Sequence, residues 1–148
     1  MTGRNGWTGT IPGMPRSGDV ATRTKTMTMR DIELYTEITG DRNPLHYDEE
    51  LARASLFGGL IVQGGVTTGI LNALVAEDLP GPGTVFLGME LKFLKAVYVG
   101  DTITGRIELT SVREDKPICS MAVTVTNQNG ELCLSGVATT YTTPLKPV

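Results

Sequence analysis

The C-terminal half of the chain alternates between apolar and polar residues in a way that predicts β-strands. Four segments carry this pattern, separated by short polar or Gly-containing runs: residues 84–96, 102–112, 118–126 and 131–141. Two of the strands place apolar or small residues on one face: Ile103, Gly105, Ile107 and Leu109 in one, Cys119, Met121, Val123 and Val125 in the other. Consecutive strands joined by short turns predict an antiparallel meander.

The N-terminal half begins with a predicted strand and continues with helical patterns. Residues 19–26 are rich in Thr with charges at alternate positions, which suits a half-exposed strand. Thr28 as an N-cap and Asp31 in the first turn predict the start of a helix over about 29–38. The residue that follows the last turn of a helix is often glycine, so Gly40 predicts the end of this helix.

A second short helix and a long one follow before the four strands. Asp48 predicts the N-cap of the short helix, which ends near Ala54. Residues 60–78 are apolar on nearly every side, which predicts a long helix buried against a sheet. This order of elements indicates an α+β fold, with an antiparallel sheet packed on one helix. We expect a single domain over residues 19–143, preceded by a flexible tail over residues 1–18.

Composition and charge exclude several classes of function. The net charge of −3, with no basic excess, argues against nucleic acid as a partner. No apolar run approaches the ~20 residues of a membrane span, and residues 1–18 lack the apolar core of a secretory signal. Cys119 and Cys133 flank a predicted hairpin turn at 127–130 without facing each other, which predicts two buried thiols in a reducing compartment, the cytoplasm. One histidine and two separated cysteines do not make a metal site.

Residues 39–46, TGDRNPLH, carry the candidate chemistry. They hold the only histidine of the chain and an aspartate five residues before it. Gly40 and Pro44 bracket the stretch and predict a loop with no helix through it. On a rigid loop, Asp41 and His46 can converge on one small molecule such as water, as acid–base catalysis requires. The alternative is a turn with an incidental histidine, because Asp and Asn side chains often hydrogen-bond their own backbone.

A longer stretch, residues 35–46 with the sequence YTEITGDRNPLH, followed by Ala52, resembles the hydratase signature of the MaoC-like family. That family includes the (R)-specific enoyl-CoA hydratases. Four further segments resemble these hydratases: residues 60–65, 86–93, 97–101 and 112–117. The resemblance implies a hot-dog fold, in which an antiparallel β-sheet wraps around one long central α-helix. It also implies a homodimer or higher homo-oligomer in which two sheets join edge to edge.

The resemblance further implies a hydro-lyase that hydrates trans-2-enoyl-CoA to (R)-3-hydroxyacyl-CoA, or catalyses the reverse dehydration. In this scheme Asp41 and His46 hold and activate one water, and the backbone N–H of Gly64 binds the thioester oxygen as negative charge develops on it. The candidate substrate-binding residues are Asn43, Gln63 and Gly65. The scheme needs no metal and no redox cofactor, because CoA or acyl carrier protein arrives as part of the substrate.

Three departures from the family pattern bear on specificity. Gln63 stands where a second histidine is frequent, Gly65 where methionine is frequent, and Ala96 where proline is common. The first two flank the expected oxyanion donor, so we hypothesise that Gly65 and Thr68 leave room for a longer or branched acyl group. For Asn43 the alternative role is support of the loop. Two other functions stay open: a 3-hydroxyacyl-carrier-protein dehydratase of fatty-acid or polyketide synthesis, and a non-catalytic acyl-CoA-binding protein.

Overall fold

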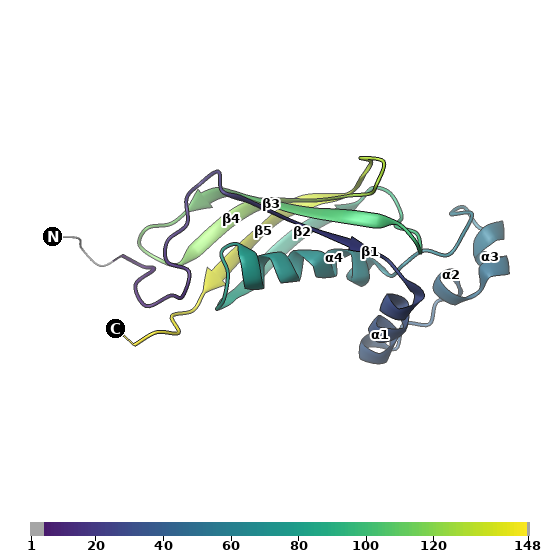
Figure 1. The fold of residues 1–148 in the computed structure, drawn as a ribbon, viewed down its shortest axis with the longest axis horizontal. Helices are drawn as coiled ribbons and strands as arrows, with labels where there is room; N and C mark the ends of the chain where they lie inside the picture. The colour runs from purple at the N-terminus through teal and green to yellow at the C-terminus, as the bar shows by residue number, and fades with distance from the viewer. Residues whose placement is uncertain (1–4, 148) are drawn as a thin grey trace.

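One helix crosses the face of a five-stranded antiparallel sheet (Figure 1). The structure is a computed structural model that describes residues 5–147. The strand order is β1-β3-β4-β5-β2. The strand bounds are Val20–Thr26 for β1, Thr84–Phe93 for β2, Thr102–Val112 for β3, Ile118–Thr126 for β4 and Leu132–Thr142 for β5. The α+β class predicted from the alternating pattern is therefore confirmed.

The central helix, α4 (Gly64–Ala73), continues into a π-helical turn, η1 (Leu74–Asp78). The predicted helix began at residue 60, but the helical backbone starts only at Gly64. Leu71 of α4 and Leu74 of η1 are fully buried against the sheet. The alternating faces predicted for β3 and β4 supply the opposite side of this core: Ile103, Ile107, Leu109, Met121, Val123 and Val125. Burial of each large aliphatic side chain contributes about 1.5–3 kcal/mol, so this layer holds the helix to the sheet.

The predicted four-strand meander is wrong at its first connection. Strand β2 pairs with β5, not with β3, and lies at the edge of the sheet beyond β5. The reason is that residues 94–98 leave the sheet after β2, so the turn at residues 98–101 leads into β3 without joining it to β2. The backbone N–H of Val62 donates to the carbonyl of Val97 at 2.9 Å, and Val97 is buried beside the segment that leads into α4. This connection packs against residues 60–62 before the chain enters β3.

Three short helices project beyond the end of the sheet where α4 begins (Figure 1). They are α1 (Met29–Thr39), α2 (Pro44–Tyr47) and α3 (Glu49–Ala54). Helix α1 starts at a capping box between Thr28 and Asp31 and ends at Gly40, whose φ of 80° is left-handed. Both predicted helices are confirmed, and Asp48 caps α3 as expected. No helix in the described part of the chain combines the length and apolarity needed to cross a bilayer.

Helix α2 corrects the prediction that no helix enters residues 39–46. It begins at Pro44, so His46 lies on a single helical turn and not on a loop. Proline suits the first helical position, because its fixed φ is compatible with a helix and its missing N–H would have no helical partner there. Asn43 completes the start by capping the turn. The stretch that carries Asp41 and His46 is therefore half loop and half helix.

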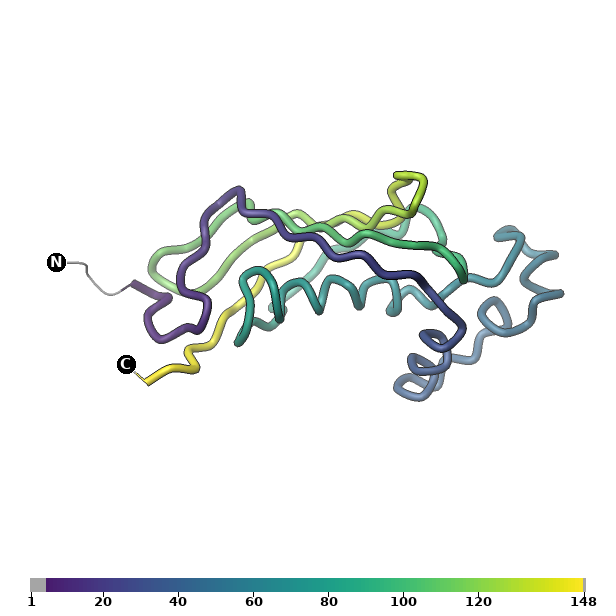
Figure 2. Tube along the Cα trace, viewed as in Figure 1, coloured from purple at the N-terminus to yellow at the C-terminus, as the bar shows by residue number. Residues whose placement is uncertain are grey.

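The N-terminal segment packs on the end of the sheet opposite to α1–α3 (Figure 2). We predicted a flexible tail over residues 1–18, but Trp7 is 2% exposed and its Nε1–H donates to the carbonyl of Arg113 at 2.7 Å. The carbonyl of Gly9 accepts the N–H groups of Leu145 and Lys146. Burial of a tryptophan stabilises the segment, so the packed domain includes residues well before position 19. Residues 1–4 of the predicted tail lie outside the described residues.

Both thiols are free and buried, as predicted. Burial raises the pKa of Cys119 to about 11 and raises that of Cys133 as well. A raised pKa keeps a thiol protonated at neutral pH, and the thiolate is the reactive form. We therefore expect the native protein to resist a thiol-specific reagent near neutral pH, with both cysteines reacting after unfolding. Fast labelling of the folded protein, followed by mass spectrometry, would contradict this expectation.

Candidate active site

Asp41 lies on the loop after α1 and His46 lies on α2, and their side chains approach each other. The Nε2 atom of His46 lies 3.8 Å from Oδ2 of Asp41. The His46 side chain is 8% exposed and that of Asp41 is 37% exposed, so the pair has one buried and one accessible partner. The separation exceeds a direct hydrogen bond but allows both atoms to contact one water-sized molecule at about 2.8 Å each. The sequence prediction that these two residues converge agrees with this geometry.

The histidine ring is held from its far side. Its Nδ1 lies 2.7 Å from the carbonyl oxygen of Ile61. A carbonyl oxygen can only accept, so Nδ1 carries a proton and donates it to Ile61. In the neutral ring, Nε2 is then the unprotonated nitrogen and faces Asp41. The backbone therefore selects the tautomer in which the basic nitrogen points into the site.

The aspartate is oriented by its own loop. Oδ1 of Asp41 accepts the N–H of Asn43 at 3.1 Å, and the N–H of Asp41 donates to Oγ1 of Thr39 at 3.2 Å. These short-range bonds fix one carboxylate oxygen and leave Oδ2 directed at His46. The local side-chain to backbone hydrogen bonds that were expected of a simple turn are thus present, and they orient the carboxylate of Asp41.

The side-chain oxygen of Asn43 accepts a hydrogen bond from within the same stretch of chain. Its Oδ1 accepts the N–H of Leu45 at 3.1 Å and so caps α2, while its carbonyl accepts the N–H of His46 at 2.9 Å. These contacts agree with the loop-supporting role that was the alternative to substrate binding. They also explain how one residue places both members of the pair, since its own N–H holds Asp41.

Gln63 lies in the protein interior and not on an open surface. It is 1% exposed, and its Nε2 donates to the carbonyl of Ile32 at 3.1 Å and to Oγ1 of Thr36 at 3.3 Å. The Thr36 hydroxyl also donates to the carbonyl of Asp41 at 2.7 Å and bonds with the hydroxyl of Tyr47. Sequence reasoning did not single out Thr36 or Tyr47. The one available signal was a polar residue on the buried face of a helix, four residues after Ile32.

Gly64 and Gly65 form the first turn of α4. The first N–H groups of an α-helix have no partner inside the helix, and Gln63 at the N-cap gives them no side-chain hydrogen bond. They therefore present donors together with the positive end of the helix dipole, which suits a developing oxyanion. A Cβ added at Gly64 would lie 3.0 Å from the ring of Phe93, so a side chain at this position would crowd that ring.

The space expected above Gly65 is already filled. A Cβ added there would overlap the hydroxyl of Tyr35, whose ring covers the backbone at this position. The hypothesis that Gly65 leaves room for a longer acyl group therefore does not hold at Gly65 itself. One turn later, a Cβ at Gly69 would meet nothing within 4 Å.

Two cavities flank the start of α4, one on each side. The first, of about 430 Å³, lies between β1, α1 and α4 and includes Tyr35, Gly65 and Gly69 in its lining. The second, of about 340 Å³, lies toward β2 and is lined in part by Gly64 and Phe93. Both fall within the size range of small-molecule sites. Among residues 5–147, no three His, Cys, Asp or Glu side chains gather in a way that would hold a metal ion.

Comparison with known proteins identifies the family behind this geometry. A family model described as a MaoC like domain matches residues 13–130. The chain belongs to the MaoC-like family. An (R)-specific enoyl-CoA hydratase from Aeromonas caviae is 34% identical to this MaoC-like chain over 121 residues, which cover 82% of it and 90% of the relative. The expected membership in this family is therefore confirmed.

Solved structures and a further relative extend the comparison. The (R)-hydratase from A. caviae involved in PHA biosynthesis matches the MaoC-like chain with a TM-score of 0.83 at 32% identity, covering 87% of this chain and 98% of that one. A mitochondrial 3-hydroxyacyl-[acyl-carrier-protein] dehydratase from Arabidopsis thaliana is 34% identical over 99 residues, 67% of this chain and 58% of the relative. These matches confirm the hot-dog fold and, at the level of the family, the hydro-lyase class.

Proposed function

We propose that this MaoC-like protein adds water to trans-2-enoyl-CoA to form (R)-3-hydroxyacyl-CoA, and that it catalyses the reverse dehydration. The observation that carries the proposal is the 3.8 Å separation of Asp41 Oδ2 and His46 Nε2, each held from behind. The free N–H groups at the start of α4 add donors for a thioester oxygen. The substrate class and the (R) configuration follow the names of the similar hydratases.

In the proposed mechanism, the pair positions one water and moves its proton. Nε2 of His46 takes a proton from the water as the oxygen bonds to Cβ, and Asp41 orients the water and stabilises the imidazolium. The electrons of the C=C bond move toward the carbonyl, whose oxygen gains negative charge near the N–H of Gly64. The imidazolium then returns the proton to Cα. The net reaction adds one water across the double bond, with its hydroxyl on Cβ and its proton on Cα. These steps need no metal or redox cofactor.

The direct test follows the absorbance of the conjugated enoyl thioester after the purified protein is added to crotonyl-CoA. We expect rapid loss of the absorbance with the wild-type protein. Longer trans-2-enoyl-CoA substrates and crotonyl-acyl carrier protein, run in parallel, distinguish CoA from carrier-protein specificity, which matters because one relative is a carrier-protein dehydratase. Tight binding of all these thioesters without turnover would overturn the proposal and support a non-catalytic acyl-CoA-binding protein.

We further infer a homodimer that joins the two sheets along β2. This strand ends the strand order, so in the described residues its outer backbone edge has no strand partner. Apolar side chains on and beside it are exposed: Val85 at 55%, Leu87 at 58%, Met89 at 44% and Val137 of β5 at 54%. An exposed edge of this kind is a template for pairing with another strand. A second copy of the same edge is the partner that would continue the sheet and pair these backbone groups.

Lysine substitutions on β2 test the dimer. We expect wild-type protein to sediment at twice the chain mass and a Leu87→Lys, Met89→Lys double variant to shift to monomer, because buried unpaired charges oppose association. The matched control is Val20→Lys on β1, the opposite edge of the sheet, where the side chain is 45% exposed. Wild-type protein that stays monomeric in analytical ultracentrifugation would rule this dimer out.

A further inference from the structure

A buried hydrogen-bond network lies directly behind the candidate active site. Its centre is the hydroxyl of Thr36, which is 4% exposed and lies on α1. This hydroxyl is 2.7 Å from the carbonyl oxygen of Asp41, 3.0 Å from that of Ile32 and 3.3 Å from Nε2 of Gln63, and it bonds with the hydroxyl of Tyr47. The network thus joins α1, the Asp41 loop, α2 and the residue that precedes α4.

Donor and acceptor chemistry gives the network one consistent assignment. A threonine hydroxyl has one proton, and the shortest of its carbonyl contacts is to Asp41. Thr36 therefore donates to Asp41 and accepts from Gln63 and from Tyr47. The amide of Gln63 must point its nitrogen at Ile32, because the Ile32 carbonyl can only accept. In this assignment every donor of the network has an acceptor.

The same assignment leaves one atom without a partner. The Oε1 of Gln63 is buried and has no hydrogen-bond partner among residues 5–147. A buried unsatisfied acceptor destabilises a fold, since its hydration is lost and not replaced. A methionine would fill a similar volume without that cost. Stability alone therefore does not account for an amide at this position.

We propose that Thr36 and Gln63 are positioning residues for the hydration reaction, an inference that rests on the proposed function. Thr36 holds the carbonyl of Asp41, and Gln63 directly precedes Gly64, the candidate oxyanion donor. The hydrogen bond between their side chains therefore fixes the carboxylate loop relative to the N–H groups of α4. Neither side chain touches the reacting atoms. Their effect is to hold the water and the thioester oxygen at the spacing that the transition state needs.

The test compares two variants at Thr36 in the crotonyl-CoA assay. Thr36→Val keeps the shape and removes the hydroxyl, whereas Thr36→Ser keeps the hydroxyl. We expect Thr36→Val to lower kcat about 10- to 100-fold, because small misplacements of reacting groups have effects of that size. KM should stay within about twofold, because the network does not contact the substrate. Thr36→Ser should restore most of kcat.

A second variant separates positioning from folding. Gln63→Met removes the tether together with the unsatisfied Oε1, so we expect kcat to fall while the melting temperature stays unchanged or rises. If the wild-type protein turns over and both Thr36→Val and Gln63→Met keep its kcat, this inference is overturned while the proposed function stands. Equal losses in Thr36→Val and Thr36→Ser would also overturn it, since the hydroxyl would then be irrelevant. A wild-type protein without turnover would overturn the proposed function and this inference with it.

Discussion

Replacing Asp41 with asparagine, or His46 with glutamine, is expected to lower kcat for crotonyl-CoA hydration about 10²- to 10⁴-fold, the usual contribution of a positioned proton-transfer group. Asparagine keeps the bond from the N–H of Asn43 but removes the charge that would stabilise an imidazolium. Glutamine removes the basic nitrogen that faces Asp41. The two residues act on one water, so the kcat of the double variant should be only slightly lower than that of the less active single variant. The enoyl-thioester absorbance assay measures all three.

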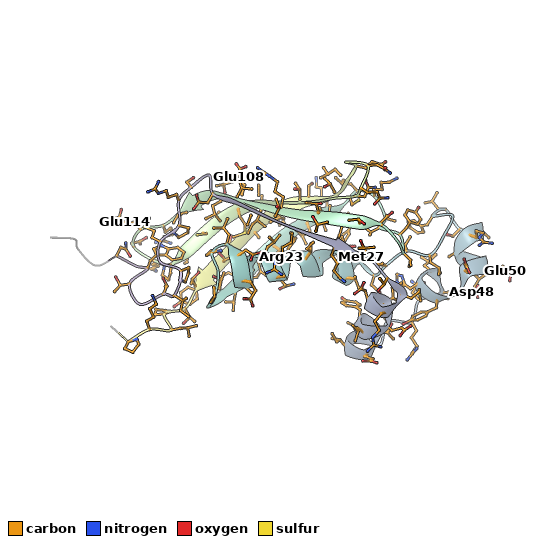
Figure 3. The ribbon with its side chains drawn as sticks, in the orientation of Figure 1. Arg23, Met27, Asp48, Glu50, Glu108 and Glu114 are labelled. Atoms are coloured by element: carbon orange, nitrogen blue, oxygen red, sulfur yellow. The ribbon has the colours of Figure 1, made fainter. Side chains whose placement is uncertain are left out.

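A carboxylate outside the site provides the control. Glu50 extends from α3 at the outer end of the helical projection, away from the sheet (Figure 3). Glu50→Gln makes the same chemical change as the Asp41 variant and should leave kcat unchanged. A kcat for Asp41→Asn within about threefold of wild type would show that this carboxylate is not part of the chemistry.

Replacing Gly136 with alanine is expected to give the largest loss of stability that a single methyl group can cause in this sheet. Gly136 of β5 pairs with Leu91 of β2, and a Cβ at Gly136 would overlap the carbonyl oxygen of Glu90. That oxygen belongs to the backbone of the neighbouring strand, so no side-chain rotation relieves the contact. We expect a destabilisation of about 3 kcal/mol, at the upper end for overpacking. The melting temperature would fall by roughly 6–12 °C.

The matched control lies in the same ladder. Gly88 of β2 pairs with Thr139 of β5, but a Cβ added at Gly88 would meet nothing within 4 Å. Gly88→Ala should therefore melt at or slightly above the wild-type temperature, because alanine also reduces the entropy of the unfolded chain. Equal melting temperatures for the two variants, measured by circular dichroism, would mean that β2 and β5 do not approach as closely as described.

Local chemistry made much of the fold readable from the sequence. The alternation of Ile103, Ile107 and Leu109 placed one face of β3 correctly, and Thr28 with Gly40 placed both ends of α1. The position of β2 was not readable, because pairing with β5 depends on how residues 94–101 bury Val97. Trp7 shows the same limit in the N-terminal segment. Its composition resembles a tail, and only the tertiary contact with Arg113 reveals the packing.

The candidate site divides in the same way. The spacing of Asp41 and His46, and the glycines at the start of α4, are local features that sequence alone could interpret. The contacts of Gln63 could not be predicted from the sequence, because its partners Ile32 and Thr36 lie about 30 residues earlier in the chain. The space above Gly65 was misjudged for a similar reason: Tyr35, which fills it, comes from another helix.

The configuration of the product tests the central claim most directly. Crotonyl-CoA is incubated with the wild-type protein, and the 3-hydroxybutyryl-CoA formed is resolved by chiral chromatography after hydrolysis of the thioester. One water held between Asp41 and His46 would add to a single face of the double bond, and the names of the similar hydratases set the expectation that the product is (R). A racemic product, an (S) product or no hydroxyacyl product would contradict the account.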